Sequence, residues 1–195
     1  MPGNPPPFDN EIDGILLYLI QQRDGLRFAA YGLTEDQLRQ KATPASTLTV
    51  GGLVKHSAKT ERGWIDILAG TPEDSSEEEY GADFVLNDDE SYETLLALLD
   101  ETAAHTEQVV RALPNLDVTI QLPEAPWYPA NPDGYSARWV LLHVLEELAR
   151  HAGHADIVRE HIDGATMFEL MAGAEGWPAT DWITPWQPLE RSADA

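Results

Sequence analysis

Residues 142–154 combine imidazoles and a carboxylate at a spacing that suits metal binding. The segment reads Leu-His-Val-Leu-Glu-Glu-Leu-Ala-Arg-His-Ala-Gly-His. Because each helical residue advances by about 100°, four of these side chains share one stripe roughly 80° wide. They are His143, Glu147, His151 and His154. Glu147 and His151 are four residues apart, which places their head groups close enough to share a cation. The stripe borders an apolar face. Burying these polar side chains there costs free energy unless a partner, such as a bound cation, interacts with them.

A second predicted helix, residues 49–70, offers a further ligand. His56 lies at the border of its apolar side. Two antiparallel bundle helices would bring His56 against Glu147 and His151. Two imidazoles and one carboxylate, with open positions for water or substrate, are typical of catalytic zinc, and they also suit nickel or iron. The alternative is that these are ordinary surface or hydrogen-bonded core histidines, and the spacing alone leaves both interpretations open.

Other polar residues have more ordinary interpretations. Glu61 lies within the apolar side of the helix at 49–70. It either pairs with an arginine of another helix, which we favour, or orients a ligand histidine. Glu146 and Arg150 are four apart and form an outward pair, although Arg150 is also a candidate pocket residue. We expect no metal role for His105, which has no aligned partner, or for His161, which lies near a helix end.

The absence of cysteine excludes several chemistries. Disulfides, zinc ribbons, iron–sulfur clusters and a catalytic thiol all require cysteine. Any thiol chemistry must therefore use a thiol that a partner supplies. The sequence also lacks a Gly-x-Ser-x-Gly motif, a phosphate loop, a dinucleotide-binding glycine motif and a His-Glu-x-x-His motif.

The charge balance limits the partners of this acidic protein. The chain has 195 residues with 34 acidic and 12 basic side chains, a formal net charge of -22. This balance argues against nucleic acid and against an anionic membrane surface, which both select clustered Lys and Arg. No apolar run approaches the roughly 20 residues of a membrane span, and the start does not resemble a signal peptide. We therefore expect a cytoplasmic protein, and the oligomeric state stays open, a homodimer included.

The elements that must position these residues are helices. The apolar period of 3.6 residues predicts four long helices, at residues 10–31, 49–70, 91–113 and 136–163. A capped turn is expected at 34–38 and a short helix at 166–171. Four long helices without strand-like alternation predict an all-α, up–down four-helix bundle with one or two long crossings.

The remaining segments divide the chain into three parts. Residues 1–9 are proline-rich and are expected to form a flexible arm, with the bundle at 10–164. Residues 165–195 contain three tryptophans and are expected to pack on the bundle. The acidic stretch 73–89 is expected to be a solvated loop. The proline-rich loop 123–133 contains Trp127, which we expect to cover a core edge or line a pocket.

Several of these segments resemble the DinB-like superfamily of four-helix metal proteins, in particular an actinobacterial branch of it. The resemblance lies in residues 32–38, 52–56, 138–143 and 149–157, and it extends from about residue 10 to 164. It implies an up–down–down–up bundle with one metal ligand at His56 and two at Glu147 and His151. Many members have histidine at both of the last two positions. The glutamate is similar to that of the mycothiol-dependent maleylpyruvate isomerase group, and the resemblance leaves His143 and His154 as supporting or pocket residues.

The resemblance also implies an activity. Members of known activity are transferases or isomerases that use thiols such as mycothiol, bacillithiol or glutathione. A divalent metal, zinc or else nickel or iron, would lower the pKa of the thiol so that it attacks a small electrophile. Two alternatives stay open: a metal-dependent hydrolase that uses bound water, and a non-catalytic stress or interaction protein whose metal staples the bundle.

Overall fold

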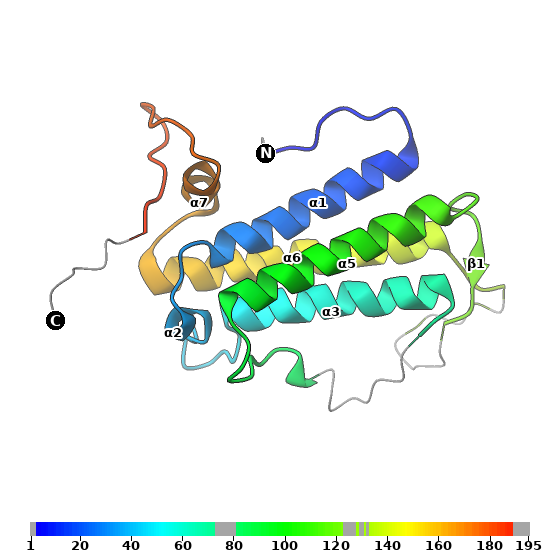
Figure 1. Ribbon diagram of the computed structural model, residues 1–195, viewed down its shortest axis with the longest axis horizontal. Helices are drawn as coiled ribbons and strands as arrows, with labels where there is room; N and C mark the ends of the chain where they lie inside the picture. The colour runs from blue at the N-terminus through cyan, green and yellow to red at the C-terminus, as the bar shows by residue number, and fades with distance from the viewer. Residues whose placement is uncertain (1–2, 73–80, 123–127, 129–130, 132, 189–195) are drawn as a thin grey trace, which may run out of the picture.

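Four long helices form the bundle in a computed structural model, which describes residues 3–72, 81–122, 128, 131 and 133–188. They are α1 (Glu11–Ala30), α3 (Val50–Ala69), α5 (Tyr92–Ala112) and α6 (Ala137–Asp163). Helices α1 and α6 run one way along the bundle, and α3 and α5 run the other way (Figure 1). The predicted all-α bundle of up–down–down–up order is therefore confirmed.

Local capping places the helix ends close to their predicted positions. The Thr49 hydroxyl accepts a hydrogen bond from the Gly52 amide at 3.0 Å at the start of α3. Ser136 caps α6 in the same way. The short helix α2 (Glu35–Leu38) begins with a reciprocal capping box between Thr34 and Gln37. Such caps satisfy amides that have no partner within the helix, so they depend on nearby residues and are readable from sequence.

Helix α6 lies between two neighbours and packs on both α1 and α3. Apolar side chains fill the space between the helices, and removing each one from water contributes about 1.5–3 kcal/mol. Fully buried members of this core are Leu19, Leu26, Leu53, Ile65, Leu99, Leu141 and Leu148. The packing against α3 brings one edge of α6 next to the N-terminal half of α3.

A short antiparallel pair of strands departs from the expectation of helices alone. Strand β1 (Thr119–Ile120) pairs with β2 (Tyr135–Ser136) immediately before α6. Two-residue strands are too short to show an alternating pattern in the sequence. Gly134 precedes β2 with φ 84, and a Cβ there would lie 2.7 Å from the Ile120 carbonyl oxygen. Glycine permits both the left-handed backbone and this approach.

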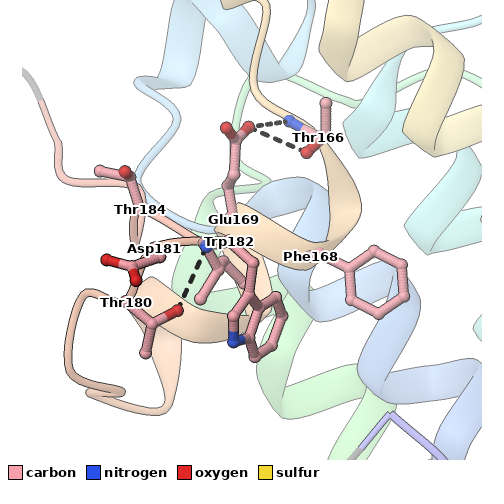
Figure 2. Close-up of a pocket in the computed structure, with 8 residues that line it drawn as sticks. Thr166, Phe168, Glu169, Thr180, Asp181, Trp182 and Thr184 are labelled. Atoms are coloured by element: carbon pink, nitrogen blue, oxygen red, sulfur yellow. Dashed lines mark hydrogen bonds between the residues drawn. The ribbon is translucent and has the colours of Figure 1, made fainter.

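The chain after α6 lies near the end of α1. Helix α7 (Met167–Ala174) contacts α1, and the Trp186 ring packs edge-on against Tyr31 with 5.6 Å between centroids. A cavity of about 530 Å³ lies beside α7. Figure 2 shows residues that line it, among them Glu169, which accepts hydrogen bonds from Thr166. Trp182, which also lines the cavity, is largely exposed. None of the described helices combines the length and apolar character that crossing a membrane requires.

Candidate metal centre

Helices α3 and α6 bring together the three side chains that the sequence singled out. His56 comes from α3, and Glu147 and His151 come from α6. Each offers a ligand atom, and these atoms all lie within 4.8 Å of one another. The His151 Nε2 atom is 3.4 Å from Glu147 Oε2, and the two imidazole rings meet edge to face with 4.8 Å between centroids. The antiparallel packing of the two helices creates this cluster.

Burial keeps the two imidazoles in the form that binds metal. His56 is fully buried, and this burial, with a smaller effect from His151, lowers the pKa of His56 to about 4. Burial also lowers the pKa of His151, although Glu147 opposes the shift. Metal binding requires a neutral imidazole, so neither ring has to lose a proton first at neutral pH. Two imidazole nitrogens and one carboxylate oxygen fit a divalent zinc, nickel or iron ion.

A third imidazole supports His151 from its other side. His154 Nδ1 lies 3.4 Å from His151 Nδ1, while His151 Nε2 faces Glu147. Metal-binding histidines commonly use their second nitrogen for a hydrogen bond, which fixes the tautomer and the ring orientation. His154 is in the position to do this for His151. On the other helix, the Thr60 hydroxyl lies 3.3 Å from His56 Nε2.

The polar stripe of α6 continues from the cluster into a group of aromatic rings. His143 lies one turn before Glu147 and stacks on Trp139, with 5.4 Å between centroids and 17° between planes. Trp64 of α3 meets His143 edge-on at 4.7 Å. His143 Nδ1 is 3.5 Å from a Glu146 carboxylate oxygen. His143 therefore lies among aromatic rings one turn from Glu147, and its role as a pocket residue stays a prediction.

Glu61 and Arg150 have partners elsewhere. The Arg23 Nε donates to Glu61 Oε2 at 2.9 Å, and the Thr106 hydroxyl donates to the other oxygen of the same buried carboxylate. Glu61 thus forms the ion pair with an arginine of another helix that we favoured. Arg150 is exposed and donates to Glu146 at 2.8 Å, as an outward pair.

Three further residues complete the account of the sequence candidates. His105 Nε2 lies 2.7 Å from an Asp66 carboxylate oxygen, and His161 Nδ1 faces the Ile157 carbonyl of its own helix at 2.9 Å. Each of the two rings therefore has an ordinary polar partner. Trp127 lies outside the described residues.

Sequence reasoning missed an aromatic residue that contacts the cluster. The Phe84 ring stacks face to face on His56, with 3.7 Å between centroids and 19° between planes. Phe84 belongs to the acidic stretch that we expected to be a solvated loop, and that expectation is wrong at two positions, Phe84, which packs on His56, and Leu86, which is buried. The available signal is the apolar triplet Phe-Val-Leu at 84–86 within the acidic stretch.

The fold and this cluster define an all-α bundle with a candidate metal centre between its second and fourth long helices. A model of the Mycothiol-S-transferase family matches residues 15–164. The chain belongs to this family, which confirms the resemblance to DinB-like, mycothiol-related proteins. Family membership implies a small thiol as a partner, and the matched range includes all three candidate ligands. No curated protein matches the chain.

Proposed function

We propose that the protein is a divalent-metal-dependent S-transferase or isomerase that activates a low-molecular-weight thiol, such as mycothiol, toward a small electrophile. The convergence of His56, Glu147 and His151 within 4.8 Å carries the proposal. The family membership supports the thiol as cosubstrate. Because the chain contains no cysteine, the reacting sulfur must come from that cosubstrate.

Each candidate ligand has a defined part in this proposal. His56, Glu147 and His151 would hold the metal, and three protein ligands leave a coordination position open. When bound, a divalent metal lowers the pKa of a coordinated thiol, which makes the thiolate available at neutral pH. His154 would keep the His151 ring oriented through the contact between their Nδ1 atoms.

The chemistry also requires a proton acceptor beside the cluster. The S–H proton must leave before the sulfur forms a bond to carbon, and a nearby imidazole can accept it. His143 borders the cluster on α6, one turn before Glu147, and is partly exposed, so it is the candidate acceptor. In a transfer, the new C–S bond replaces the bond to a leaving group. In an isomerisation, the C–S bond breaks again and the thiol is recovered.

Metal analysis of two histidine variants tests the ligand assignment. The wild-type protein is expected to contain one equivalent of divalent metal, and His151→Ala is expected to lose it while keeping its helical circular dichroism. His161→Ala is a matched control, because His161 lies on the same helix and bonds to a carbonyl of that helix. Full metal content in His151→Ala would reject the assignment.

Product analysis separates the proposed activity from its alternatives. The protein is incubated with chlorodinitrobenzene and with mycothiol, glutathione or no thiol, and the products are identified by mass spectrometry. A thiol adduct that the wild-type forms and His151→Ala does not form supports the transferase. Products that lack the thiol indicate a hydrolase. Inactivity with every thiol, together with a large fall in melting temperature on chelation, indicates a metal that only staples the bundle.

A further inference from the structure

Residues 81–90, which we call the 81–90 strap, lie along the first half of α3 and lead into α5 (Figure 1). The strap places the Phe84 ring flat on His56 and edge-on to His151, with 5.8 Å between the last two centroids. We propose that the strap positions His56, with Phe84 holding the imidazole in the orientation that a metal ion at the cluster requires. This inference rests on the proposed function only for the identity of the bound ion.

Two consecutive glycines in α3 form a notch that admits the strap. A Cβ at Gly52 would overlap the carbonyl oxygen of Phe84. A Cβ at Gly51 would lie 2.7 Å from a Leu86 methyl carbon and 2.9 Å from the Leu38 carbonyl oxygen. Glycine is a poor helix former, but it permits close approach of another backbone. The notch therefore sets how near the aromatic ring comes to His56.

Charged side chains of α3 hold the strap on both sides of the aromatic ring. The buried Lys55 ammonium donates to the Val85 carbonyl at 2.9 Å and to Glu90 Oε2 at 2.9 Å. Burial raises the pKa of Glu90, but hydrogen bonds from Lys55 and the Asn87 amide, together with the positive charges of Lys55 and Lys59, lower that pKa overall. The glutamate is thus charged at neutral pH. Lys59 adds an ion pair to Asp83 at 2.7 Å.

The stacked ring has a direct consequence for metal affinity. The outer torsion of a histidine side chain is broad, so an unsupported imidazole samples many orientations. Phe84 covers one face of the His56 ring and restricts that motion, which reduces the ordering that metal binding must impose. Residues that orient a metal ligand typically change affinity by about 10–100-fold when they are replaced. We expect a loss of this size when the aromatic ring is removed.

Phe84→Leu tests the inference against a neighbouring control. Zinc is titrated by calorimetry into metal-free protein, and Phe84→Leu is expected to bind it about 10–100-fold more weakly than wild-type. Val85→Ala is the control, since Val85 belongs to the strap but is 62% exposed, and its affinity is expected to stay unchanged. Phe84→Tyr keeps the stacked ring and is expected to keep wild-type affinity.

An NMR measurement on the metal-free protein tests the ring contact itself. The stacked Phe84 ring is expected to shift the His56 imidazole proton resonances upfield. Phe84→Leu should remove this shift, and Val85→Ala should retain it. If Phe84→Leu leaves both the resonances and the zinc affinity unchanged, the inference is overturned. If wild-type shows the ring shift but binds no zinc, the proposed function fails while the positioning of His56 stands.

A pair of glycine variants tests the notch independently of the aromatic ring. Gly52→Ala should displace the strap and weaken zinc binding even though Phe84 is present. Gly63→Ala is the matched control, because it makes the same change in the same helix at a position where a Cβ meets nothing within 4 Å. Equal zinc affinity and equal His56 resonances in the two variants would contradict the notch.

Discussion

Replacing Glu61 tests whether this residue stabilises the bundle or serves the metal centre. Its carboxylate is fully buried, and Arg23 and Thr106, its partners on α1 and α5, are buried as well. Glu61→Leu leaves the guanidinium in the core without its counter-charge and the hydroxyl without its acceptor. Removing one partner of a buried ion pair costs about 3–5 kcal/mol. For a chain of this size, that cost lowers the melting temperature by roughly 6–20 °C.

Urea denaturation followed by circular dichroism measures this cost, and a double variant isolates its origin. Arg23→Met combined with Glu61→Leu removes both charges and replaces them with apolar side chains. Such replacements of a buried pair are often neutral or stabilising, so the double variant is expected to recover most of the lost free energy of unfolding. The double-mutant cycle then gives the coupling between the two residues.

Two results would refute the reasoning. A loss below about 1 kcal/mol in Glu61→Leu would mean that the pair is far less isolated from water than its burial indicates. Loss of bound metal at unchanged stability would assign Glu61 to the metal centre, the interpretation that we did not favour. We expect the opposite pattern, with reduced stability and metal content unchanged in the folded protein.

Two further predictions concern other buried charges. Burial raises the pKa of Asp156 from its ordinary 3.8 to about 6, so the folded state disfavours the ionised carboxylate and stability falls as pH rises between these values. The full shift corresponds to about 3 kcal/mol, which partial exposure reduces to about 1–2 kcal/mol. In urea titrations, Asp156→Asn should therefore be about 1–2 kcal/mol more stable than wild-type at pH 7 and equally stable near pH 4. The same stability difference at both pH values would contradict the raised pKa. Arg159, fully buried, donates to the Ala29 and Tyr31 carbonyls at the end of α1 and stacks on Trp186. Arg159→Met should lower the free energy of unfolding by about 2–4 kcal/mol and speed proteolysis of the segment after α7. If the variant were cleaved at the wild-type rate, the contact between Arg159 and Trp186 would not hold that segment.

The helices and the histidine stripe could be predicted from the sequence because local interactions decide them. The predicted helix at 49–70 became α3 at Val50–Ala69, since the Thr49 cap and the left-handed Gly70 act within one turn of each end. The spacing of Glu147 and His151 fixes their alignment once α6 forms. His56 lies at the border of the apolar side of its own helix, which also allowed the hypothesis that it meets Glu147 and His151.

The partners that lie far apart in the chain were decided by tertiary packing. The Phe84 contact with His56 depends on how the 81–90 strap fits the Gly51–Gly52 notch. The spacing of apolar residues along the sequence does not predict such a fit. The sequence likewise left two roles open for Glu61 until α1 brought Arg23 beside it. Local patterns give each residue a position on its helix, whereas the meeting of His56 with Glu147 and His151 results from the antiparallel packing of α3 against α6.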